Sequence, residues 1–137
     1  MRIVVLMLLL AVPAWCDGIV GHWTLVEVDK ARDPRWTLEL VLEADGKASL
    51  FSQQTTEIRT TAGVKARVDE VELTGTYRRE KNSLIFFWQA KPEAADLLEA
   101  NFGASQADGS RRLDYRQAKQ LVLTGPRVLS FDKKPAP

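Results

Sequence analysis

Cysteine and histidine are almost absent from this 137-residue chain, which contains one of each, Cys16 and His22. A thiolate or imidazole metal site needs several such ligands in one place, so the sequence predicts no metal site. The chain also lacks the glycine-rich phosphate loops, the nucleophile elbow and the zinc-protease helix that mark common enzymes. We therefore predict a protein without catalytic residues and without a cofactor. A lone histidine beside Trp23 is more typical of a structural side chain than of a ligand.

An excess of charge of either sign is missing as well, because 19 Lys and Arg residues are balanced by 18 Asp and Glu residues. A surface that binds nucleic acid needs a basic excess, so we predict no nucleic-acid partner. The basic clusters Arg78-Arg79 and Arg111-Arg112 favour solubility over recognition, and the acidic run from Asp69 to Glu72 favours a solvated face over a cation site. With 45% hydrophobic and 27% charged residues, the chain is typical of one globular domain.

Long hydrophobic runs are limited to the N-terminus, where Ile3 to Val12 are uninterrupted. A bilayer span needs about 20 apolar residues, so this run is too short to cross a membrane. Arg2 before it and Ala14-Trp15-Cys16 after it complete the pattern of a secretory signal peptide. We predict that residues 1–16 are removed and that an exported domain, residues 17–137, is left in the periplasm or outside the cell without a membrane span. Cleavage after Ala14 is an alternative, and lipoprotein anchoring through Cys16 is less favoured because the preceding Trp15 is bulky.

The remaining chain shows the alternation of apolar and polar residues that is typical of β-strands. Residues 19–28 and 36–43 are such runs, and Asp45-Gly46 then predicts a tight hairpin turn. The Thr-rich stretch 52–61 predicts either an edge strand or a loop. The alternation after Gly63 slips by one residue at Asp69-Glu70, which predicts a β-bulge or a short turn there.

One segment has a helical period, because Ala94, Leu97, Leu98 and Phe102 recur at intervals of three and four residues. We therefore predict an all-β fold, an antiparallel up-and-down β-barrel of about eight strands, with one short α-helix near residues 93–102. Closure of the barrel would remove the exposed strand edges. An eight-stranded barrel has an interior that side chains just fill or that holds one small ligand.

Several short motifs resemble those of small bacterial lipocalin-like domains in the calycin group. They are Gly21-His22-Trp23 in the first strand, Asp45-Gly46, Gly75-Thr76-Tyr77 before Asn82, and the closing stretch from Tyr115 to Phe131. The resemblance implies an eight-stranded barrel in which Gly21 and Trp23 form the plug of the closed end. It also implies that Lys133 or Lys134 packs on Trp23. A counterpart of the second lipocalin signature is missing.

Two functions follow from these observations. The first is an exported binding protein that holds a small apolar or amphipathic ligand inside the barrel; its candidate ligand-binding residues are Trp36, Leu38, Leu40, Tyr77, Phe86, Trp88 and Tyr115. The alternative is a cell-envelope interaction or inhibitor protein with a packed barrel and no ligand. A roomy aromatic interior would favour the first function, and a packed interior would favour the second.

Overall fold

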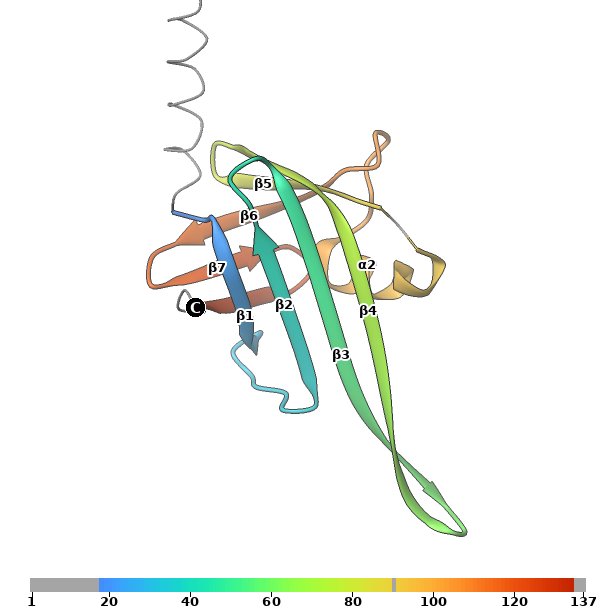
Figure 1. The fold of residues 1–137 in the computed structure, drawn as a ribbon. Coiled ribbons are helices and arrows are strands. Elements are labelled where there is room, and N and C mark those ends of the chain that lie inside the picture. The colour runs from blue at the N-terminus through green and yellow to red at the C-terminus, as the bar shows by residue number, and fades with distance from the viewer. Residues whose placement is uncertain (1–17, 90, 135–137) are drawn as a thin grey trace, which may run out of the picture.

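A computed structural model describes residues 18–89 and 91–134, so the predicted signal peptide lies outside the described residues. The described residues form eight strands that close into one barrel, and Figure 1 shows how the sheet wraps around. The strands are β1 (Gly21–Val28), β2 (Trp36–Leu42), β3 (Lys47–Thr60), β4 (Gly63–Glu80), β5 (Ser83–Trp88), β6 (Arg111–Gln117), β7 (Gln120–Thr124) and β8 (Val128–Lys133). A 3-10 turn, η1 (Pro92–Ala94), leads into the helix α2 (Ala95–Phe102).

Each strand pairs in antiparallel fashion with the next one along the chain, and β8 pairs with β1 to close the barrel. Trp23 is opposite Leu40 on one side and opposite Lys133 on the other. The predicted up-and-down barrel of eight strands and the short helix near residues 93–102 are therefore confirmed. No helix within the described ranges is long and apolar enough to cross a membrane.

The alternation in the sequence decides which side chains face the barrel interior. In β2, Leu38, Leu40 and Leu42 are buried, whereas the residues between them are more exposed. Leu40 is opposite Leu50 of β3, and Leu50 is opposite Leu73 of β4, so apolar side chains continue around the wall. Burial of each such side chain stabilises the fold by about 1.5–3 kcal/mol relative to exposure.

Gly75 of β4 lies directly against the main chain of β5. A Cβ atom at this position would be 2.2 Å from the carbonyl oxygen of Phe87 and 2.9 Å from the Cα of Trp88. Only glycine leaves room for this approach. In the register of β4 and β5, Trp88 is opposite Gly75 and Phe86 is opposite Tyr77.

The hairpin formed by β3 and β4 extends far beyond the barrel (Figure 1). Its pairing is unbroken from Lys47 opposite Thr76 to Thr60 opposite Gly63, so the expected bulge or turn at Asp69-Glu70 is wrong. The alternation slips there because the hairpin leaves the barrel, and beyond this point there is no core for apolar side chains to face. The stretch 52–60 is strand, and a register shift lies instead between Leu25 and Glu27 in β1.

Candidate functional site

The barrel interior contains most of the residues predicted to bind a ligand. Leu38, Leu40, Tyr77, Phe86 and Trp88 are at most 9% exposed, and Trp36 and Tyr115 are half-buried and pack against the same core. The structure therefore brings this predicted set together around one core. Trp36 is near the end from which the hairpin projects, where its Nε1 donates to Ser52 Oγ at 2.9 Å.

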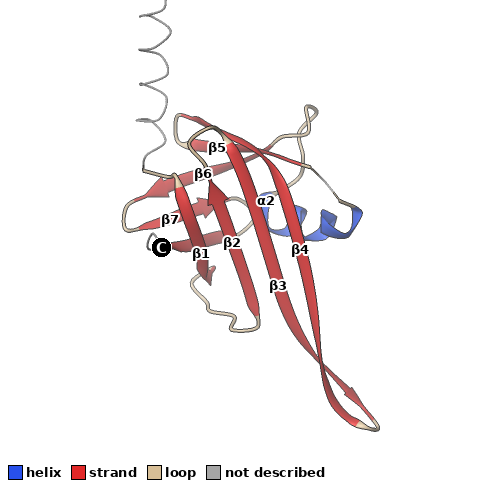
Figure 2. Cartoon of the chain, viewed as in Figure 1, coloured by secondary structure: helices blue, strands red, loops and turns tan. Residues whose placement is uncertain are grey.

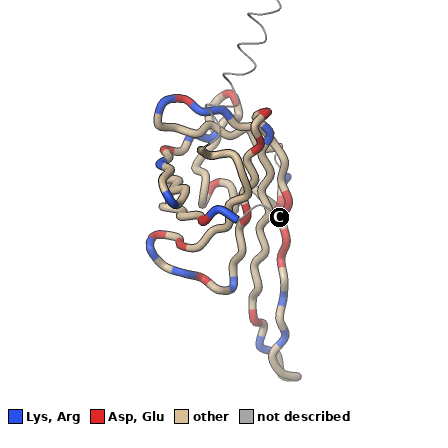
Figure 3. Tube along the Cα trace, turned by 60° about the vertical axis from the view of Figure 1, so that its left-hand side comes forward, with Lys and Arg blue, Asp and Glu red and all other residues tan. Residues whose placement is uncertain are grey.

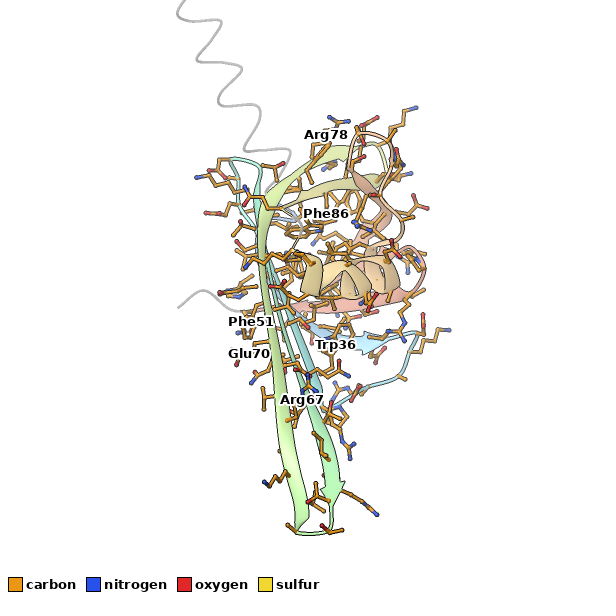
Figure 4. All side chains as sticks on the ribbon, turned by 90° about the vertical axis from the view of Figure 1, so that its right-hand side faces the viewer. Trp36, Phe51, Arg67, Glu70, Arg78 and Phe86 are labelled. Carbon is orange, nitrogen blue, oxygen red and sulfur yellow. The ribbon has the colours of Figure 1, made fainter. Side chains whose placement is uncertain are left out.

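Three aromatic rings occupy the interior next to the helix. Phe86 and Trp88 stack with centroids 5.2 Å apart and planes inclined by 7°. Phe102 of α2 meets both rings edge-on, at 5.4 Å and 5.6 Å. Such stacked and edge-to-face pairs are favourable beyond their buried area. The helix, blue in Figure 2, thus inserts Phe102 and Leu98 into the barrel, and Figure 4 shows Phe86 at the level of this helix.

The opposite end of the barrel is closed around Trp23, the predicted plug. Trp23 is 1% exposed, and its Nε1 donates to the carbonyl oxygen of Ile19 at 2.8 Å. Lys133 Nζ lies over the ring, 5.6 Å from the centroid, in cation–π geometry. A Cβ on Gly21 would be 2.7 Å from Lys133 Cε, so glycine leaves room for this lysine. At the same end the Tyr77 hydroxyl donates to the Glu43 carbonyl at 2.6 Å.

Among the residues that the structure describes, two buried polar atoms near the helix have no hydrogen-bond partner. They are Trp88 Nε1, a donor in the barrel interior, and Asn101 Oδ1, an acceptor on α2. The Asn101 Nδ2 group does donate to the Leu97 carbonyl at 2.9 Å. A buried donor or acceptor without a partner costs about 1–3 kcal/mol, so these atoms are suited to polar groups from outside the chain.

A groove of about 460 Å³ lies on the outer surface of the sheet and not in the interior. It contains the lone histidine: His22 Nε2 is 3.6 Å from Glu39 Oε2, and Lys134 Nζ donates to Glu39 Oε1. The hydrogen bond from Lys134 lowers the pKa of Glu39 below its ordinary value, and the charges of Lys134 and His22 add to this effect. The groove is lined by His22, Glu39, Val41, Ser49, Leu50, Phe51, Glu72, Leu73, Thr74, Gln89 and Lys91.

The groove does not contain the donor set of a metal centre. Within residues 18–89 and 91–134, no three His, Cys, Asp or Glu side chains lie close enough together to hold an ion. The acidic run predicted as a solvated face lies on the hairpin, where residues Asp69, Glu70 and Glu72 are exposed. Arg67 pairs with Asp69 there at 3.1 Å.

The projecting part of the hairpin is the surface feature that the sequence analysis missed. Residues 56–70 are exposed, and three of them are large and apolar, Ile58, Val64 and Val68. Val64, Ala66 and Val68 share one side of the hairpin with Phe51, because directly opposed and alternate residues share a face. Figure 4 shows Phe51 and Glu70 on one side of the hairpin and Trp36 on the other. The sequence does contain a signal for the projection: two adjacent alternating runs are each longer than a strand of a small barrel needs to be.

These features define a class of fold, the lipocalin-like β-barrel. A lipocalin-like protein from Bacteroides uniformis has a similar crystal structure, with a TM-score of 0.52, 14% identity, and coverage of 85% of this chain and 99% of that chain. An uncharacterised protein from Bacteroides eggerthii is also similar, with a TM-score of 0.47, 13% identity, and coverage of 84% and 98%. At such low identity the likeness shows the fold alone. No family model and no curated protein matches the sequence.

Proposed function

We propose that the chain is an exported lipocalin-like interaction protein, in which the barrel is a rigid support and the β3–β4 hairpin is the element that contacts another protein. The filled interior carries this proposal. Phe86, Trp88 and Phe102 occupy the space beneath α2 where a ligand-binding lipocalin-like barrel would need a cavity. The available apolar surface lies on the hairpin instead.

The hairpin has the physical features of a contact element. Its apolar side chains Ile58, Val64 and Val68 are 41%, 61% and 49% exposed, and burial against a partner would stabilise a complex. Exposed strand edges are ready templates for pairing with another chain. An eighteen-residue β4 is about three times the usual strand length, so its extension serves no purpose in closing the barrel.

Photocrosslinking in the cells that make the protein tests this proposal. A photoreactive phenylalanine analogue at Val64 is expected to form defined protein adducts. The matched control carries the same analogue at Thr37, an exposed residue on the outer surface of β2. Adducts at position 64 and none at position 37 support the proposal. Absence of any adduct at position 64, or equal adducts at both positions, contradicts it.

A second candidate function, ligand binding in the barrel, is favoured by Nε1 of Trp88, a buried donor for which the described ranges 18–89 and 91–134 provide no acceptor. Entry of a ligand would require Phe102 and Leu98 of α2 to leave the barrel, since both are buried there. Titration of a fluorescent fatty-acid analogue while tryptophan emission is followed tests this function, in the wild type and in Phe86→Ala, which has extra space. Saturable quenching in the wild type supports binding. No response in either protein excludes a ligand of this class.

Export is the part of the proposal that rests on residues 1–16. The intact mass of the protein recovered from the envelope or medium is expected to correspond to a chain that begins at Asp17 and carries no lipid. A mass that includes a diacylglyceryl group on Cys16 would replace free export by membrane anchoring. A mass that includes residues 1–16 would contradict the signal peptide.

A further inference from the structure

The edge of β4 that faces away from β3 is open over the projecting part of the hairpin. Within the described part of the chain, β5 pairs with β4 only from Gly75 onward, and Gln89 N–H donates to the Thr74 carbonyl at 2.9 Å. No described strand pairs with Gly63–Leu73 on this side. This open edge, Gly63–Leu73, is eleven residues long, which is more than enough for pairing with another strand.

The main-chain groups that point out of the open edge can be identified from two hydrogen bonds. Thr74 uses its carbonyl toward Gln89, away from β3, whereas Tyr77 N–H donates to the Gly46 carbonyl, toward β3. Main-chain direction alternates along a strand, and the β3–β4 register has no break. The outward N–H and C=O groups therefore belong to Val64, Ala66, Val68, Glu70 and Glu72.

The open edge has opposite charges in its two halves. Lys65 and Arg67 lie between the tip and Val68, and Asp69, Glu70 and Glu72 lie between Val68 and the barrel. Along β4, Figure 3 shows basic residues toward the tip of the hairpin and acidic residues toward the barrel. The neighbouring strand β3 also has an acidic residue near the tip, Glu57. An antiparallel copy of the same edge would place each basic half against an acidic half.

We propose that the open edge of β4 pairs with the same edge of a second copy of this chain, antiparallel about a two-fold axis at Val68. This inference rests on the proposed role of the hairpin as a contact element and names its partner. Val68 is then opposite Val68 of the second copy, and Arg67 is opposite Asp69 of the second copy, twice by symmetry. The five outward-facing residues of each copy exchange both of their hydrogen bonds across the interface, which joins the two sheets.

Charge selects this register over its neighbours. An axis at Arg67 would place two arginines in opposition, and an axis at Asp69 would place two aspartates in opposition. An axis at Ala66 would place Lys65 against Arg67, and an axis at Glu70 would place two glutamates in opposition. Like charges in directly opposed positions are destabilising, so among these five axes only the one at Val68 places no like charges in opposition.

The length of the open edge independently selects the same register. Val68 is its middle residue, so pairing about Val68 brings Gly63 opposite Leu73 of the second copy and uses the whole edge. Beyond Leu73 the edge is occupied by Gln89, and beyond Gly63 the strand ends. The centre required by charge and the centre required by length are therefore the same residue.

Cysteine crosslinking tests the register in the full chain, with Cys16→Ser as the common background. In Val68→Cys the two new cysteines would be opposed, with Cα atoms about 5.5 Å apart, which suits a disulfide. The matched control is Val64→Cys. Position 64 is more exposed, but in the proposed pair its two copies are separated by about 27 Å. Rapid disulfide-linked dimers of Val68→Cys and not of Val64→Cys are expected. Equal crosslinking, or none, overturns the proposal.

A charge swap provides the second measurement, with the dissociation constant of the dimer from analytical ultracentrifugation as its readout. Arg67→Asp alone and Asp69→Arg alone each oppose like charges twice and are expected to weaken the dimer about tenfold or more. The double variant R67D/D69R restores opposite charges across the axis and is expected to recover wild-type affinity. A wild-type chain that remains monomeric at all concentrations, or single variants that dimerise as the wild type does, overturns the proposal.

The same readouts separate this inference from the proposed function. If the photocrosslinked adduct at Val64 contains a second copy of the chain, both the interaction function and the pairing of two copies are supported. If it contains a different protein and the wild type is monomeric, the interaction function stands and the pairing with a second copy fails.

Discussion

Lys133 and Trp23 face each other across the seam between β8 and β1, with the lysine ammonium 5.6 Å from the centre of the buried indole ring. The two residues are 110 positions apart in the sequence, so this contact exists only when the barrel is closed. The indole is also tied to Ile19 by its N–H. Trp23 therefore connects the N-terminal segment, the first strand and the last strand.

Replacement of Trp23 by alanine is expected to lower the free energy of unfolding by about 3–5 kcal/mol, because it removes a buried aromatic side chain and leaves a cavity. Urea denaturation followed by circular dichroism measures this change. Lys133→Met is the matched comparison: it keeps an apolar stem over the ring and loses the charge, so a loss of about 1 kcal/mol or less is expected. Equal stability of Trp23→Ala and the wild type would contradict the role of Trp23 as the plug.

Gly75→Ala is expected to lower the free energy of unfolding by about 1–3 kcal/mol, because the added Cβ would overlap the main chain of β5 at Phe87. The neighbouring exposed residue provides the control, since Thr74→Ala adds no atom near β5. Thermal melting of both variants checks the prediction. If Gly75→Ala has the same melting temperature as the wild type, β4 and β5 are not held as closely as the structure describes.

Glu39 is expected to make stability depend on pH in the acid range. The hydrogen bond from Lys134 lowers the pKa of Glu39 in the folded state, so its carboxylate stabilises the fold above the ordinary glutamate pKa. This contribution is lost as the pH falls through the lower folded value. Urea unfolding of the wild type and Glu39→Gln between about pH 7 and pH 3 should show a stability difference that shrinks in acid. A difference that is independent of pH would contradict this origin.

Removal of the projecting hairpin is expected to leave the barrel folded. Residues 55–68 can be replaced by Asn-Gly, because Gln54 and Asp69 are directly opposed and a two-residue turn joins such a pair. The deleted segment is largely exposed, so a change of no more than about 1 kcal/mol in the free energy of unfolding is expected. Loss of the cooperative transition would show that the hairpin is part of the folding unit.

The alternation of apolar residues was sufficient to predict the barrel wall. Leu38, Leu40 and Leu42 repeat every second residue, and Asp45-Gly46 follows them as a turn, so strand and hairpin are both encoded locally. The same pattern gives a wrong expectation for the hairpin. Val64 and Val68 alternate as core residues do, but alternation records only that two residues share a face, not whether another layer covers that face.

Whether the barrel interior is filled or open could not be predicted from the strand residues either. Phe86 and Trp88 were predicted to face inward, and they do so. The space beside them is filled by Phe102, the last residue of α2, which lies 14 residues after Trp88 in the chain. The helical period of residues 93–102 predicts an apolar face, but the direction in which that face docks depends on tertiary packing.

The seam between β1 and β8 also has a consequence for how the chain reaches its native state. Seven of the eight strand pairings join neighbours along the chain, whereas the eighth joins the two ends of the domain. Contacts between such distant segments must overcome a large loop entropy and slow the folding of β-barrels. Until Val128–Lys133 has been synthesised, β1 has one unpaired edge and Trp23 lacks its cover, so a growing chain needs protection from aggregation over nearly its whole length.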